Sequence, residues 1–492
     1  MRSETGELGK QTTEVVFRQQ GVPQKSWVLD RLYRLTQRFL VEATSPLHRS
    51  VAEMQRSACW ICVAIIFQAL NEVDYHWYLS YVPALLSWGA LIPLFLFLCS
   101  FTAMYTAFRR PKTRERTDEA GQRRPRRWQR IVIILTLLTA IGGTVELGRT
   151  VVEGFFMPPQ FTNDGTSLDT NAASLLLQGH NPYSDSNILS LVRRFPIEPY
   201  WTTPLRQGQL ADTLQYPSTW ELRAILDTDL KSGSAPEFES KVSYPALSFL
   251  SLVPFIWLNI YNVLPLYLFC YLLIVAIGWK IARREMRPLV LLISLANVGM
   301  WSSVVGGNVD LLYIPFVVLA WLVLEQGWWS AIFLGLAAAS KQPAWLLIPF
   351  YAILVYRRYG LGETCRRLSI TGIIFLAFNL PFMLSDPQAW LAGVLAPVAD
   401  PMFPMGVGLV GLSTTPIFSY LPTVFYTTLE AVAMLLCLGW YWRICKSRPE
   451  AAMLLAFLPL FFAWRSLASY FYCSALPLFI LQMARVLPDR DN

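Results

Sequence analysis

Long apolar runs alternate with short polar segments along most of the chain. A helix that crosses a bilayer needs about 20 apolar residues, and runs that approach or exceed this length recur from residue 57 onward. The pattern predicts an all-α polytopic membrane protein with about ten to thirteen transmembrane helices. The predicted crossings lie near 57–71, 82–107, 131–152, 243–258, 260–279, 288–305, 309–324, 330–356, 368–384, 417–442, 451–464 and 466–484.

The polar segments between these runs predict which side of the membrane each one faces. The loop 109–130 is strongly basic, which is typical of a cytoplasmic loop, whereas "NEVDYHWYLS" at 71–80 is acidic and aromatic and is predicted as a loop on the other side. The run 131–152 then delivers the chain to the non-cytoplasmic face. The longest polar segment follows there, within 150–241, and long loops of this kind are usually functional.

Two segments do not fit a simple alternation of crossings. The groups "KIARREMR", "RRYGLGETCRR" and "RICKSRPE" are all predicted to be cytoplasmic because of their basic residues. Either 243–279 makes one full crossing plus a half-helix, or 330–356 is a bent hairpin at "SKQPAW". The sequence leaves this choice open.

Composition supports the membrane assignment. Hydrophobic residues make up 54% of the 492 residues and charged residues only 15%, whereas soluble domains carry roughly 25% charged residues. The net charge of +8 reflects the basic loops, so nucleic acid is not an expected partner. We found no phosphate-binding glycine loop and no set of metal ligands at a recognisable spacing, so neither a cofactor nor a metal is predicted.

Two carboxylates follow the third predicted crossing. Asp164 lies in "TNDG", which is typical of a turn, and Asp169 opens "LDTNAASLLLQG", which predicts a short helix that ends at Gly179. A carboxylate above the membrane could accept a proton from a sugar hydroxyl, and the alternative role is a helix cap. The candidate residues of this segment are Asn163, Asp164, Asp169, His180, Asn181 and Tyr183.

Further polar residues interrupt the later apolar runs. Ionisable groups at membrane depth are costly and are therefore functional candidates. Lys341 needs a negative partner, for which a phosphate ester is suited, and the guanidinium of Arg465 matches phosphate oxygens. The alternatives are a lysine that extends to the interface and an arginine paired with a carboxylate. The other candidates are Tyr244 in "VSYPALS", Asn308 and Asp310 in "VGGNVDLL", Gln342 in "SKQPAW" and Tyr470 in "WRSLASYF".

The order of these motifs resembles the GT-C transferases of glycosyltransferase family 87, which are polyprenol-phosphate-mannose-dependent α-mannosyltransferases. The resemblance covers roughly 131–484 and rests on "LLLQGHNPY", "YPALSFL", "GGNVDLL", "FLGLAAASKQPAWLLIPF" and "WRSLASYF". It implies that an aspartate of the first large outer loop is the general base, which corresponds to Asp164, with Asp169 as the second candidate. It also implies that Lys341 matches the family's lysine and that "GHNPY" shapes the site.

The expected organisation has four parts. Residues 1–56 are a cytoplasmic segment, 57–130 an additional helix pair with its basic loop, 131–484 the GT-C-like catalytic domain with its outer loop at 150–241, and 485–492 a tail. We expect a multi-pass protein of the plasma (inner) membrane with its site on the non-cytoplasmic face. The expected activity is inverting transfer of a hexose, mannose by the resemblance, from a polyprenyl-phosphate donor to a glycolipid or glycan acceptor. The alternative is a transporter or a flippase for lipid-linked sugars, which breaks no bond.

Overall fold

The computed structural model describes most of the chain from residue 51 onward. The described residues are 51–81, 91–109, 127–158, 161, 163–195, 197–414 and 418–484. The predicted cytoplasmic segment up to residue 50, most of the basic loop and the tail 485–492 lie outside the described residues.

The described residues are mostly helical and contain a single pair of two-residue strands. The first helices are α2 (Val51–Tyr81), α4 (Leu91–Phe108) and α5 (Arg127–Phe156). The polar segment then forms α6 (Asp164–Leu177), α7 (Pro182–Asp185), α8 (Ile188–Arg194), η1 (Pro199–Trp201), η2 (Gly208–Leu210) and α9 (Thr219–Ser232).

The second half of the chain returns to apolar helices. These are α10 (Leu247–Leu250), α11 (Val253–Trp257), α12 (Leu264–Ile281), α13 (Arg287–Ala296), α14 (Val298–Val305), α15 (Asp310–Leu322), α16 (Gly327–Ser340), α17 (Leu347–Tyr359), α18 (Leu361–Ser385), α19 (Pro387–Ala399), α20 (Thr423–Ile444), α21 (Ala452–Leu455) and α22 (Ser469–Met483). The 3₁₀ turns among them are η3 (Arg284–Met286), η4 (Gln342–Leu346), η5 (Leu409–Thr414), η6 (Pro449–Ala451) and η7 (Leu458–Phe462), and the strands are β1 (Met405–Gly406) and β2 (Arg465–Ser466).

Several helices are long and apolar enough to cross a membrane. Within the described ranges five pass this test, namely α4, α5, α12, α18 and α20, and the bent pair that joins the η3–α13 stretch to α14 gives a sixth if it is one span. By length and composition these helices are consistent with an all-α polytopic protein. The ten to thirteen crossings require the shorter apolar helices as well, and that number stays a prediction.

One predicted loop is wrong. The stretch "NEVDYHWYLS" at 71–80 is not a loop but belongs to α2, which continues without a break to Tyr81. No glycine or proline occurs between Val51 and Tyr81, and these are the residues that most strongly interrupt a helix. Polar side chains alone did not end the helix.

The two alternatives for the segments 243–279 and 330–356, short helices before a long one and a bent hairpin, both occur. The segment 243–279 forms the four-residue α10, the five-residue α11 and then one long helix, α12. The segment 330–356 bends at "SKQPAW", and the helices on its two sides, α16 and α17, run in opposite directions. Ser330 at the start of α16 lies 2.7 Å from the Tyr351 hydroxyl of α17, and Tyr359 at the end of α17 donates to Glu325 just before α16 at 2.7 Å. Lys341 therefore lies at the tip of a helical hairpin.

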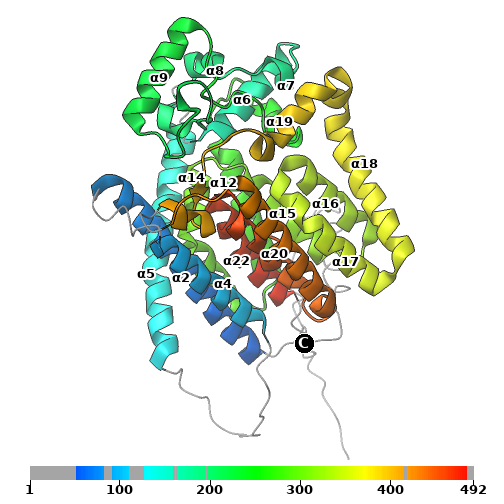
Figure 1. The fold of residues 1–492 in the computed structure, drawn as a ribbon. Coiled ribbons are helices and arrows are strands. Elements are labelled where there is room, and N and C mark those ends of the chain that lie inside the picture. The colour runs from blue at the N-terminus through cyan, green and yellow to red at the C-terminus, as the bar shows by residue number, and fades with distance from the viewer. Residues whose placement is uncertain are drawn as a thin grey trace, which may run out of the picture. The chain divides into compact units, whose positions relative to one another are not determined.

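The polar segment folds as a unit with its own hydrophobic core. Figure 1 shows α6, α7, α8 and α9 gathered at one end of the helices, and we call residues 161–246 the loop module. Leucine, isoleucine and phenylalanine side chains fill its interior, and Phe403, from the segment after α19, packs among them. The glycine predicted to end the first helix does so, since Gly179 follows α6 with φ +84°.

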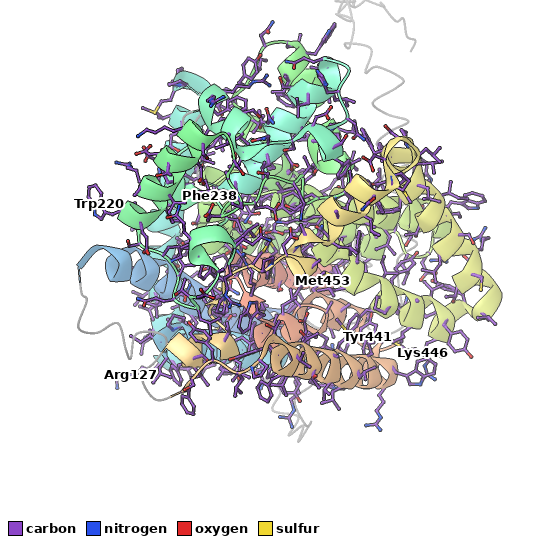
Figure 2. The ribbon with its side chains drawn as sticks, turned by 45° about the horizontal axis from the view of Figure 1, so that its top comes forward. Arg127, Trp220, Phe238, Tyr441, Lys446 and Met453 are labelled. Atoms are coloured by element: carbon purple, nitrogen blue, oxygen red, sulfur yellow. The ribbon has the colours of Figure 1, made fainter. Side chains whose placement is uncertain are left out.

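The loop module should lose stability when its core is cut. Phe238 is 2% exposed and lies inside the module, whereas Trp220 projects from its edge and is 79% exposed (Figure 2). Phe238→Ala is expected to destabilise the module by about 3–5 kcal/mol, and Trp220→Ala by no more than about 0.5 kcal/mol. Limited proteolysis in detergent checks this, because cleavage should rise within the loop module only in Phe238→Ala. Equal protection of the two variants would contradict this account of the core.

Candidate functional site

The loop module is joined to the apolar helices through the first turn of α6. Asn163 caps this helix, since its side chain accepts a hydrogen bond from the Thr166 amide at 2.8 Å, and it also donates to the Gly306 carbonyl. The Thr166 hydroxyl donates to the Gly307 carbonyl. The two glycine carbonyls lie between α14 and α15, so the sequence "VGGNVD" presents backbone acceptors to which α6 binds.

A buried ion pair lies beneath this junction. The Lys341 ammonium is 2.9 Å from Oδ1 of Asp310, and these side chains are only 6% and 0% exposed. Lys341 also donates to the Asn308 side chain at 3.2 Å and lies 4.9 Å from the centre of the Tyr244 ring. The tip of the α16–α17 hairpin is thereby tied to the start of α15. The lysine does have a negative partner, as predicted, but that partner is a carboxylate of the protein.

Asp169 lies close to the same ion pair and is completely buried. Its Oδ1 accepts a hydrogen bond from the Ser248 hydroxyl at 3.0 Å, and among the described residues its Oδ2 has no partner. Burial raises the pKa of Asp169 to about 8, although the Ser248 hydrogen bond and the charge of Lys341 act against this rise. Asp169 is therefore mostly protonated at neutral pH, and Lys341 and Asp310 balance each other.

Asp164 is the first residue of α6 and differs from Asp169 in its surroundings. Its side chain is partly exposed, and it accepts a hydrogen bond from the Gly165 amide at 2.8 Å. Partial burial raises the pKa of Asp164, while a hydrogen bond with Thr203 and the charge of Arg465 lower it. A carboxylate that solvent can reach and whose pKa is raised is suited to accept a proton.

Arg465 faces Asp164 from a distant part of the chain. It lies on β2, which pairs in parallel with β1, so that Met405 is opposite Arg465 and Gly406 opposite Ser466. Gly406 has φ +133°, and a Cβ there would lie 2.1 Å from the Ser466 carbonyl oxygen, so this pairing requires glycine. Within the described ranges Arg465 forms no salt bridge and makes one weak contact, with the Met405 sulfur at 3.6 Å. Tyr470 is within electrostatic range of both Arg465 and Lys341.

Nothing in the sequence pointed to Thr203, yet its side chain is a hydrogen-bond partner of Asp164. Its carbonyl accepts a hydrogen bond from the Glu239 amide at 2.9 Å, and Leu205, two residues later, forms an isolated bridge with Met402. Met402 precedes β1, the strand that pairs with Arg465 of β2. Extended backbone therefore connects the region of Thr203 to the position of Arg465. "WTTPLRQ" carries no motif, and only the tertiary structure identifies this residue.

Two predicted binding residues lie away from this cluster. His180 and Asn181 follow α6, and a helix of 14 residues is about 20 Å long, so they lie near the end of the helix opposite to Asp164. The His180 ring is 3.1 Å from the Asp185 carboxylate, and Asn181 caps α7. The helix separates His180 and Asn181 from Asp164, and their role in substrate binding stays a prediction.

Two other candidates hold backbone segments in place. The hydroxyl of Tyr183 donates to the Tyr244 carbonyl at 2.8 Å, and its ring packs on Phe249 and Phe382. The Gln342 amide donates to the carbonyl of Ser243 and, at 2.9 Å, to that of Val394. Their contacts connect the loop module to α18, α19 and the tip of the α16–α17 hairpin.

The described part of the chain holds no group of three or more His, Cys, Asp or Glu side chains that could bind a metal ion. The arrangement instead offers a partly exposed carboxylate with a raised pKa, Asp164, and a cation without a salt bridge among the described residues, Arg465. Behind them lies the buried pair of Lys341 and Asp310. Comparison of the chain with family models, curated proteins and solved structures finds no match.

The buried ion pair should behave as a unit in stability measurements. Lys341→Met leaves the Asp310 carboxylate buried and alone, which should cost about 3–5 kcal/mol, whereas Lys341→Met with Asp310→Leu removes both charges and should recover most of this loss. Thermal unfolding in detergent measures the difference. Arg223→Gln is the control, because it breaks an exposed pair with Glu198 and should cost about 1 kcal/mol or less. A double variant less stable than Lys341→Met would refute the coupling.

Proposed function

We propose that this chain is a membrane hexosyltransferase. It transfers a hexose from a polyprenyl-phosphate-linked donor to a hydroxyl group of a glycolipid or glycan acceptor, and it inverts the anomeric carbon. The observation that carries the proposal is the pairing of Asp164 with Arg465. The two side chains attract each other, yet Arg465 has no carboxylate at salt-bridge distance among the described residues, so its charge is available to a substrate.

In the proposed reaction Asp164 accepts the proton of the acceptor hydroxyl as its oxygen attacks the anomeric carbon. The bond between that carbon and the phosphate oxygen breaks, and its electron pair stays on the departing lipid phosphate. Arg465 stabilises the charge on this phosphate through its forked donors, and fixed cations act strongly where water is scarce. The resemblance names mannose as the transferred sugar.

Lys341 has a supporting role in this mechanism. Its ammonium is paired with Asp310 and buried, so we assign the donor phosphate to Arg465 and give Lys341 the role of positioning α15, α16 and the Tyr244 ring below α6. Asp169, with its pKa of about 8, belongs to the same support. Tyr470 and Arg465, which are both partly exposed, remain for substrate contact.

The lengths of the helices support a donor that arrives through the lipid. The helices α15, α16, α17 and α22 have 13 to 15 residues and are therefore about 20 Å long, which is shorter than the bilayer's hydrocarbon core of about 30 Å. The ends of α15, α16 and α22 at Asp310, Lys341 and Tyr470 lie within electrostatic range of one another. In a multi-pass protein with the loop module on the non-cytoplasmic face, this depth suits a phosphate attached to a lipid.

The two aspartates of α6 provide the sharpest test of the proposed base. Asp164→Asn is expected to lower the transfer rate by about 100- to 10,000-fold, because it removes the proton acceptor. Asp169→Asn should retain most of the activity, because Asp169 is already mostly uncharged at neutral pH. Purified protein in lipid vesicles is incubated with polyprenyl-phosphate [¹⁴C]mannose and membrane-extracted acceptors, and labelled product is counted.

Each alternative predicts a different result in this assay. Loss of activity in Asp169→Asn with normal activity in Asp164→Asn would exchange the roles of the two residues. If labelled donor crosses the vesicle membrane intact and no glycosidic bond forms with any acceptor, the chain is a flippase and the proposal is wrong.

The pH dependence of the reaction should report on Asp164. The base works when it is deprotonated, so the rate should rise with pH around a folded-state pKa above the ordinary aspartate value of about 3.9. The positive charge of Arg465 lowers this pKa, so Arg465→Gln should move the rise to higher pH, and Thr203→Val should do the same. Rate–pH profiles of the single-turnover reaction measure the shift, with Arg223→Gln as the control. An unchanged profile in Arg465→Gln would contradict the electrostatic interaction between Arg465 and Asp164.

A further inference from the structure

A cavity of about 490 Å³ opens on the loop module, away from the Asp164 cluster. It lies between the later part of α6, the turn that follows this helix, α8 and the end of α9. Its volume falls in the range of about 300–1,000 Å³ that small-molecule sites occupy. Asp185, Arg193 and Arg194 contribute its charged groups, and the His180 ring also lines it.

Neutral groups hold the two arginines in place. Arg194 donates to the Asn171 side chain at 3.2 Å and to the Ser174 hydroxyl at 2.7 Å. Arg193 donates to the Leu230 carbonyl at 3.2 Å. In the described ranges neither arginine has a carboxylate at salt-bridge distance. Both guanidinium groups are therefore oriented while their charges remain uncompensated.

The charges around the cavity favour an anion. The one carboxylate in its lining, Asp185, already faces His180 at 3.1 Å, so the two arginines give the cavity a positive charge. Guanidinium forks match the paired oxygens of phosphate and carboxylate groups. Asn187 and Ser190 add neutral polar groups that suit hydroxyls, and Leu175 and Leu189 supply a small apolar wall.

The cavity and Asp164 lie along the same side of α6. Asn171, which lines the cavity, is seven residues after Asp164. Seven residues make almost two complete turns of a helix and cover about 10 Å along its axis. Leu168 lies between them on that side and is buried in the core of the loop module, so the cavity and Asp164 are separate sites along the helix.

We propose that this cavity binds the phosphate or carboxylate group of an anionic sugar. This proposal does not rest on the proposed transferase function. Arg193 and Arg194 hold the anionic group, and the neutral polar groups of the lining contact the sugar hydroxyls. The cavity thereby selects sugars by charge at a distance from the Asp164 cluster.

Binding is tested with the full-length protein in a detergent that carries no sugar, in a buffer free of phosphate. Isothermal titration compares glucose 6-phosphate and glucuronate with neutral glucose. At least one of the two anions should bind about tenfold or more tightly than glucose, and Arg193→Gln with Arg194→Gln should remove this preference, because a charge-assisted bidentate contact contributes about this factor. Arg223→Gln changes an exposed arginine of α9 outside the cavity and should leave binding unchanged.

Several results would overturn the site. Equal affinity for glucose and both anions, or wild-type affinity in the double variant, would exclude an oxyanion site at these arginines. Arg194→Lys guards against loss of folding, because it keeps the charge but not the fork and should weaken binding less than Arg194→Gln. Asp164→Asn separates the two proposals: anion binding that persists in this variant supports the cavity whether or not transfer is lost, and its loss would contradict a separate site.

Discussion

The structure around the candidate site depends on the buried pair of Lys341 and Asp310. A charge removed from water is costly unless a partner of opposite sign lies beside it, and here each member of the pair is that partner for the other. Asp310 begins α15, Lys341 occupies the tip of the α16–α17 hairpin, and Asn308 and the Tyr244 ring complete the lysine's surroundings. The pair therefore fixes the helix ends on which α6 rests.

The same region separates charges that support the fold from the charges that our proposal assigns to a substrate. Lys341 and Asp310 neutralise each other, and burial keeps Asp169 mostly protonated at neutral pH. Asp164 and Arg465 lie at the edge of this cluster, partly exposed and without a salt bridge between them. An inverting transfer requires a base on one side of the sugar and a cation on the other, and this pair has the chemistry for both positions.

Backbone pairing rather than helix packing brings Arg465 to this position. The strand that contains it pairs with Met405 and Gly406, and the preceding Met402 bridges to Leu205, close to Thr203. The loop module thus positions both charged groups of the proposed reaction. Its helix α6 carries Asp164, and its extended segment at Leu205 is connected through Met402 to the strand pair that contains Arg465. A shift of the module relative to the helices would change both positions at once.

Hydropathy alone predicted the helical class, the polar module after α5, and most of the polar residues that gather near Asp164, because a long apolar run or a charge within one has few physical explanations. It failed for "NEVDYHWYLS", where helix propensity outweighed polarity, and it did not show that α6 separates His180 from Asp164. It also could not tell that the partner of Lys341 is Asp310 or that Thr203 contacts Asp164. These are contacts between residues far apart in sequence, and they depend on how helix ends and strands meet, which no local pattern specifies.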